Sequence, residues 1–238
     1  MIKFDFEKIK PFCESFSLSL DNRICDMLNI YGNMLLEWNE KMNLTAIKEP
    51  DDILFKHFYD CLLFLKHIKM NENCSLIDVG TGAGFPGMVL KIARPDIELT
   101  LLDGLNKRLI FLNAVLNELG LKAETVHIRA EEAGKLNKYR EKFDIATARA
   151  VAPLQVLCEY CIPLVKKNGL FVAMKGAAAS EEMSVSQNAY KLLGSEKPTI
   201  ICETLGGNDN RAFIISKKIS QTSPKYPRVN GKIAKNPL

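Results

Sequence analysis

The chain has 238 residues, of which 47% are hydrophobic and 25% charged, as in a folded globular protein and unlike a disordered one. Its net charge of +4 permits a nucleic-acid partner without requiring one. The seven cysteines are scattered, and no segment approaches the ~20 apolar residues of a membrane helix. We therefore expect a cytoplasmic protein with reduced thiols and no membrane partner.

Residues 1–70 are predicted to form a helical extension, because apolar side chains recur there at helical spacing in three segments. Ser19 or Asp21 is expected to cap the second helix. The third is expected to begin near Asp51 or Asp52.

Residues 71–218 alternate between strand and helix patterns, which is typical of a parallel sheet with helical crossovers. The last two strands are separated only by the turn-like GGNDN at 206–210, so they are expected to pair antiparallel. This arrangement predicts a Rossmann-like α/β fold of the class I methyltransferase type, with a mostly parallel seven-stranded sheet and a C-terminal antiparallel hairpin. The predicted strands are 75–80, 98–103, 123–128, 143–149, 169–176, 199–205 and 212–218.

A glycine-rich turn follows the first predicted strand, in the sequence DVGTGAGFPG at 78–87. Gly80 and Gly82 allow a ligand to approach the backbone closely, because no Cβ intervenes. Asp103 ends the next strand, where a carboxylate can accept the hydroxyl hydrogens of an adenosine ribose. The alternative is a tight turn without a ligand, with Asp103 as a strand-end cap.

Two features of this turn favour S-adenosylmethionine over a dinucleotide. Asp78 would be unfavourable beside a pyrophosphate but favourable beside the ammonium group of a methionine moiety. Pro86, expected in the first turn of the following helix, removes one backbone donor from the helix start. Ala130 and Glu131 follow the third strand and are expected near the adenine, although Glu131 suits a helix N-terminus equally well.

Several stretches together resemble the bacterial small-subunit rRNA guanine-N7 methyltransferases, also called the glucose-inhibited division protein B family. The resemblance implies a cofactor site at Gly80, Phe85, Ala130, Glu131 and Arg149, with Asp103 on the ribose. It also implies a guanine target in 16S rRNA near the decoding region. The family usually has a proline at the position of Ile233. The matching stretches are NLTAI (43–47), HFYDCL (57–62), LIDVGTGAGFPG (76–87), LLDGLNKRLIFL (101–112), RAVAPL (149–154), MKG (174–176) and the tail from 222.

Guanine N7 carries a lone pair and no proton, so its methylation needs alignment and not an obligate catalytic base. Arg149 ends the fourth strand and is expected to position the cofactor or an RNA phosphate. Lys175 ends the fifth strand and is a second candidate for positioning the substrate, or else a solvated lysine. His57 is expected to be a packed, hydrogen-bonded histidine. Asn43 and Thr45 either line the mouth of the pocket or cap the following segment.

Residues 219–238 form a basic tail without acidic side chains. We expect this tail to contact the phosphates of its partner, 16S rRNA or the small ribosomal subunit, and Tyr226 to stack on a base. The alternative is a solvated, disordered end. The candidate RNA-binding residues are Lys225, Tyr226, Arg228, Lys232 and Lys235.

Other functions are compatible with parts of the pattern. A methyltransferase with the same core could act on another RNA, a small molecule or a protein, and a non-enzymatic module could bind RNA without transferring a methyl group. Asp78 and the final hairpin argue against an NAD-dependent oxidoreductase. Cys158 and Cys161 form a single CxxC within a helical pattern, so we predict core packing and no metal site. A monomer is favoured.

Overall fold

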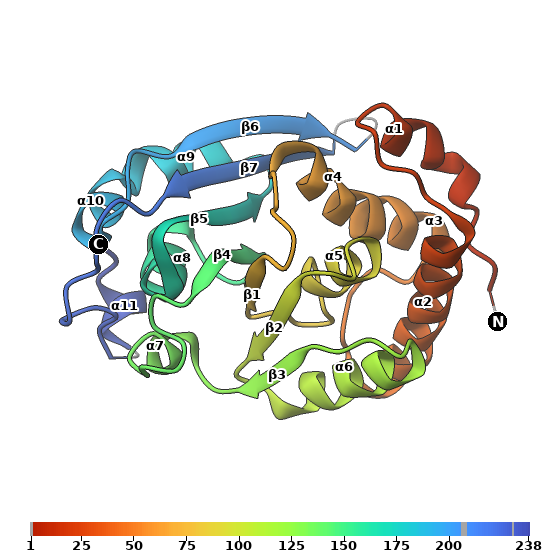
Figure 1. Ribbon diagram of the computed structural model, residues 1–238, viewed down its shortest axis with the longest axis horizontal. Helices are drawn as coiled ribbons and strands as arrows, with labels where there is room; N and C mark the ends of the chain where they lie inside the picture. Colours follow the sequence, from red (N-terminus) through yellow and green to blue (C-terminus); the bar gives the residue numbers. More distant parts are fainter. Residues whose placement is uncertain (1, 206–208, 230) are drawn as a thin grey trace.

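A seven-stranded sheet runs through the middle of the computed structural model, which describes residues 2–205, 209–229 and 231–238, and helices cover both of its faces (Figure 1). The strands lie in the order β3-β2-β1-β4-β5-β7-β6. Their bounds are β1 Ser75–Val79, β2 Glu98–Asp103, β3 Glu124–His127, β4 Phe143–Arg149, β5 Val165–Lys175, β6 Thr199–Thr204 and β7 Asn210–Lys217.

The directions of the strands confirm the predicted fold. Neighbours pair in parallel from β3 to β5, whereas β7 runs antiparallel to both β5 and β6. Residues 206–208 of the predicted turn between β6 and β7 lie outside the described residues. The five parallel strands place the carboxyl ends of β1, β2 and β4 along one edge of the sheet, where open α/β folds bind their ligands.

Among the described residues, no helix is long and apolar enough to cross a membrane. The helices divide into two sets by the face of the sheet they cover. One set shares a core cluster with the N-terminal residues, and the other packs with the C-terminal half. The first set is η1 (Phe6–Lys8), α1 (Lys10–Glu14), α2 (Asn22–Met42), α3 (Pro50–Asp52), η2 (Ile53–Tyr59), α4 (Asp60–His67), α5 (Gly87–Ala93) and α6 (Asn106–Glu118). The second is α7 (Ala130–Ala133), α8 (Leu154–Cys161), η3 (Ile162–Leu164), α9 (Ala179–Val185), α10 (Gln187–Leu193) and α11 (Lys232–Lys235).

The N-terminal helices are joined to the sheet by aromatic packing. Asp21 caps α2 as one of the two predicted candidates, because its side chain accepts a hydrogen bond from the Ile24 amide at 2.8 Å. Farther along α2, the ring of Tyr31 lies 5.8 Å from Phe58 in η2 and 5.5 Å from Phe85 in the glycine-rich turn. The predicted boundary near residue 70 therefore crosses a continuous core.

The C-terminal tail is packed against the second set of helices. Arg228 forms paired hydrogen bonds, 2.7–3.1 Å long, with the carboxylate of Glu159, which is fully buried in α8. Arg140 donates to the carbonyls of Thr222 and Tyr226. Tyr226 is only 6% exposed and Arg228 is already paired, so the structure favours a structural role for both residues over the predicted contacts with RNA.

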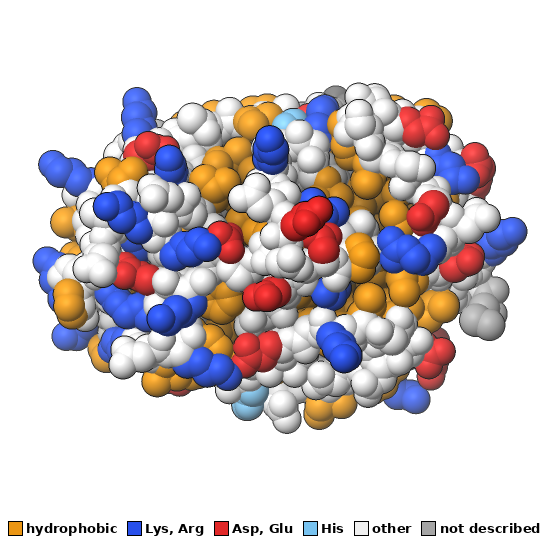
Figure 2. All heavy atoms as spheres, viewed as in Figure 1, with side chains coloured by type: hydrophobic (Ala, Val, Ile, Leu, Met, Phe, Trp, Pro, Cys, Tyr) orange, Lys and Arg blue, Asp and Glu red, His pale blue; other side chains and the backbone are white. Residues whose placement is uncertain are grey.

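The remaining basic residues of the tail face outward. Lys225, Lys232 and Lys235 are exposed, whereas Ile233 between them is fully buried on α11, which contacts α8. Figure 2 shows lysine and arginine side chains gathered over the end of the molecule that carries α7, α10 and α11. Their contact with RNA stays a prediction.

The CxxC cysteines pack in the core, as predicted. Cys158 and Cys161 lie on α8 and are fully buried. Burial raises the pKa of the Cys158 thiol to about 12, so it stays protonated at neutral pH.

Replacing Arg228 by alanine should destabilise the fold, because it leaves the buried carboxylate of Glu159 without its paired cation. We expect the free energy of unfolding to fall by roughly 3 kcal/mol, the cost of breaking a buried ion pair from one side. Urea denaturation measures the change. The matched control is Lys232→Ala on the exposed part of the same tail, which should stay within about 0.5 kcal/mol of the wild type. Equal stability of both variants would contradict a structural role for Arg228.

Candidate active site

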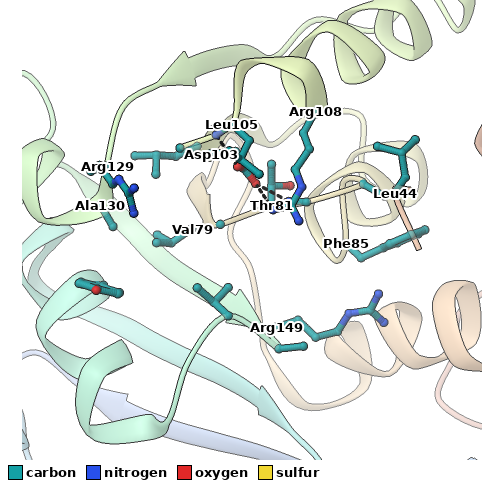
Figure 3. Close-up of a pocket in the computed structure, with 18 of the residues that line it drawn as sticks. Leu44, Val79, Thr81, Phe85, Asp103, Leu105, Arg108, Arg129, Ala130 and Arg149 are labelled. Atoms are coloured by element: carbon teal, nitrogen blue, oxygen red, sulfur yellow. Dashed lines mark hydrogen bonds and ion pairs between the residues drawn. The ribbon is translucent and has the colours of Figure 1, made fainter. Parts of the chain in front are cut away.

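A cavity of about 530 Å³ opens at the carboxyl ends of β1, β2 and β4. Its volume lies within the range of sites that hold small molecules. As Figure 3 shows, Arg129 and Ala130 stand at one end, Phe85 and Arg149 at the other, and Val79 between them. These loops lie together as the sequence predicted, because parallel strands put their carboxyl ends side by side.

The glycine-rich turn forms the floor between the two ends. The amides of Gly80 and Thr81 both donate to the carbonyl of Leu102 in β2, at 2.8 and 3.0 Å. Gly80 and Gly82 have φ angles of +67° and +61°, in the left-handed region that residues with a Cβ rarely adopt. A Cβ on Gly80 would also lie 2.7 Å from the side chain of Val151. The turn therefore requires glycine for its backbone conformation as well as for space.

Asp103 lies on the cavity wall at the end of β2, as predicted. Its carboxylate accepts hydrogen bonds from the amides of Gly82 and Leu105, at 2.9 and 2.8 Å, and from Arg108 at 3.2 Å. Figure 3 shows Leu105 and Arg108 beside this carboxylate. Two carboxylate oxygens offer about four acceptor positions, so one remains for a ligand hydroxyl. The sequence reasoning missed Arg108, which stands on the first turn of α6 and faces back to the strand.

Asp78 lies beneath the turn and not on the cavity wall where the sequence had placed it. The side chain is fully buried, and one oxygen accepts from the Thr81 hydroxyl at 2.7 Å and the Gly87 amide at 2.9 Å. Burial raises the pKa of this carboxyl to about 6, although both hydrogen bonds oppose the shift. The helix α5 starts at Gly87, so Pro86 precedes it instead of occupying its first turn. Asp78 thus shapes the turn from below.

Glu131 has an unused acceptor at the opposite end of the cavity from Phe85. The residue is 4% exposed and lines the cavity, and its Oε1 has no hydrogen-bond partner in the described part of the chain. A buried carboxylate oxygen without a donor is costly, so a ligand that brings hydroxyl or amino hydrogens suits this position. Tyr160 of α8 also lines this end, and the sequence reasoning did not identify it.

Arg149 closes the other end of the cavity and is held by the N-terminal helices. It donates to the carbonyl of Lys56 at 3.0 Å and to the carboxylate of Asp60 at 2.8 Å. Its guanidinium carbon lies 4.8 Å from the centre of the Phe85 ring, towards which it points in Figure 3. The sequence reasoning missed Asp60, although it follows His57 by one helical turn in the HFYDC stretch.

His57 is packed and hydrogen-bonded, as the sequence predicted. Its ring stacks on Phe85 with the centroids 4.3 Å apart, and its Nε2 lies 2.9 Å from the hydroxyl of Thr45. Burial, and then the charge of Arg149, lower the pKa of His57 to about 3. The imidazole is therefore neutral at physiological pH. Thr45 lines the cavity, while Asn43 ends α2 in a left-handed conformation.

Lys175 ends β5, as predicted, but it does not line the cavity. Its ammonium group donates to the carbonyl of Ala152 and to the carboxylate of Glu182, each at 2.7 Å. The side chain is only 8% exposed. These partners hold the loop after β4 and the helix α9 together, so the structure favours a structural role over the predicted contact with substrate.

Comparison with known proteins agrees with this architecture. Among solved structures, geranyl diphosphate C-methyltransferase from Streptomyces coelicolor A3(2) has a similar fold, with a TM-score of 0.52 at 12% identity over 68% of this chain and 79% of that chain. Two curated proteins, both named ribosomal RNA small subunit methyltransferase G, are far more similar. The protein from Clostridium perfringens is 46% identical over 98% of both chains. That from Acetivibrio thermocellus is 49% identical over 94% of this chain and 92% of its own.

The family model described as rRNA small subunit methyltransferase G matches residues 24–232. This span includes the glycine-rich turn, Asp103, Glu131 and Arg149, and also the packed tail up to Lys232. Sequence identity over nearly the whole length of the relatives and the described cavity thus lead to one assignment. The chain belongs to the rRNA small subunit methyltransferase G family.

Proposed function

We propose that the protein transfers a methyl group from S-adenosylmethionine to N7 of a guanine in 16S rRNA. Membership of the family is the main support for this proposal, because the similarity covers almost the entire chain. The cavity supports it independently, since its glycine-rich turn and Asp103 suit a nucleoside. The target is expected near the decoding region, presented either by the rRNA or by the small ribosomal subunit.

The residues of the cavity fit S-adenosylmethionine, which supplies an electrophilic methyl group when bound. Asp103 has acceptor capacity left for a ribose hydroxyl, and the unpaired Oε1 of Glu131 can take hydrogens from the same ligand. Gly80 and Gly82 leave room for close approach to the backbone. Phe85 contributes an apolar edge to the lining at the other end, where Arg149 and His57 hold its largely buried ring in place.

The side chains need only align the base for this reaction. Guanine N7 has no proton to lose, so the chain needs no general base there. The groups beside Phe85 agree with this, because His57 is neutral and Asp60 is paired with Arg149. These residues supply fixed, oriented contacts at that end of the cavity.

Exposed basic residues are the proposed contacts to the RNA backbone. Lys225, Lys232 and Lys235 of the tail belong to the basic end of the molecule (Figure 2). Such contacts contribute affinity that falls with salt, without selecting a sequence. We propose that a monomer binds the RNA in this way.

The proposed function predicts that loss of this gene removes one 7-methylguanosine from 16S rRNA. Mass spectrometry of nuclease digests from cells with and without the gene measures the change, because each modified guanine carries one added methyl group. Re-expression of the wild-type protein should restore the modification. Identical 7-methylguanosine content in the two strains would refute the assigned reaction.

Replacing Gly80 by alanine should weaken binding of S-adenosylmethionine. The left-handed φ of +67° costs a residue with a Cβ about 1–3 kcal/mol, and the new Cβ would meet Val151 at 2.7 Å. We therefore expect the Kd to rise about ten-fold or more, as measured by isothermal titration calorimetry.

The matched control for this variant is Gly176→Ala. A Cβ at Gly176 meets nothing within 4 Å and needs no left-handed conformation, so the Kd should be unchanged. An unaltered Kd in the Gly80 variant would mean that the turn does not bind the cofactor.

A further inference from the structure

The end of the cavity beside Glu131 rests on a helix that is too short to be stable alone. This helix, α7, has four residues, and so short a helix keeps its shape in water only when it packs against other parts of a protein. Its residues Ala130 and Ala133 lie in the same hydrophobic cluster as Tyr226 of the tail. Tyr160 of α8 completes this end of the cavity. The shape of this end therefore depends on what holds α7 and α8 in place.

The tail holds α7 at its carboxyl end. Pro227 packs so closely on Gly134, the residue after α7, that a Cβ on Gly134 would lie 2.9 Å from the proline ring. Arg140 connects the same parts by hydrogen bonds. Its Nη1 donates to the carbonyls of Gly134 and Tyr226, both at 2.8 Å, and its Nη2 donates to the Thr222 carbonyl at 2.6 Å. One guanidinium thus joins the end of α7 to two residues of the tail.

The tail holds α8 through the residue next to Tyr160. Glu159 is fully buried, and its carboxylate accepts hydrogen bonds from the Arg228 amide at 2.6 Å and from the Arg228 guanidinium at 2.7–3.1 Å. Among the described residues, Arg228 is the one cation that forms an ion pair with Glu159. Successive residues of a helix share one rigid backbone, so the position of Glu159 also fixes that of Tyr160.

We propose that tail residues 222–228 position the cofactor, with Arg140 and Arg228 as positioning residues that act through α7 and α8. This assignment rests on the proposed function, which gives this end of the cavity to the nucleoside of S-adenosylmethionine. Glu131 of α7 brings the unpaired Oε1, so a displacement of α7 moves an acceptor that the ligand needs. Neither arginine lines the cavity, so both act on the ligand through the two helices. A segment that the sequence assigned to RNA thus also supports cofactor binding.

The test measures cofactor binding and methyl transfer to 16S rRNA in variants of Arg228. The nucleoside does not change in the reaction, so a weakened contact to it raises KM and leaves kcat unaltered. We expect Arg228→Ala to raise the Kd and the KM for S-adenosylmethionine about ten-fold, roughly the value of one hydrogen bond to a charged group, at unchanged kcat. Arg228→Lys keeps a cation for Glu159 and should recover most of this affinity.

Gly134→Ala tests the same arrangement from the side of α7. Gly134 has a φ of −63°, which alanine adopts without strain, so the variant acts through its new Cβ, which must displace Pro227. Arg228 and Glu159 stay unchanged in this protein. The Kd for S-adenosylmethionine should nevertheless rise, again at unchanged kcat.

Ile24→Ala is the matched control for a general loss of stability. Ile24 is buried in the first turn of α2, in the other core cluster, and does not line the cavity. The variant loses core packing without touching α7, α8 or the tail, so its Kd should equal that of the wild type.

These variants separate the possible outcomes. An unchanged Kd in Arg228→Ala or in Gly134→Ala, or an equal rise in Ile24→Ala, would overturn the positioning role of the tail. If Arg228→Ala fails to fold, Gly134→Ala and Arg228→Lys decide the comparison. A wild-type protein that does not bind S-adenosylmethionine would instead contradict the proposed function itself.

Discussion

The cavity depends on the buried ion pair between Arg149 and Asp60. Arg149 ends the central strand β4, whereas Asp60 begins α4 in the N-terminal region, 89 residues earlier. Removing one partner of a buried ion pair lowers the free energy of unfolding by about 3–5 kcal/mol, so the fold depends on both residues. Arg211 of β7 lies 3.4 Å from the second oxygen of Asp60, which ties another strand to the same carboxylate.

This pair explains why the N-terminal helices belong to the functional unit. The partners of Arg149 come from within five residues of the chain, in η2 and at the start of α4. They are the carbonyl of Lys56, the ring of His57 and the carboxylate of Asp60. The same helix places Phe58 against Tyr31. One end of the cavity is therefore built by residues that the strand pattern alone would leave outside the core domain.

Features fixed by neighbouring residues could be predicted from the sequence, whereas those fixed by distant partners could not. The turn at Gly80, Asp103 at the end of β2 and the cap at Asp21 follow from local backbone chemistry, and the structure places all three as expected. Arg228 was expected on the surface because its partner, Glu159, lies 69 residues away in the chain. A lone basic residue in a sequence does not indicate that it will pair with a buried carboxylate far away in the chain.

Whether a basic side chain can bind RNA depends in the same way on whether it already has a buried partner. A cation already paired with a buried carboxylate could bind a phosphate only by leaving an uncompensated charge behind, so the internal pair prevails. Arg149 obeys the same rule inside the cavity, because its pairing with the buried carboxylate of Asp60 fixes where its guanidinium lies.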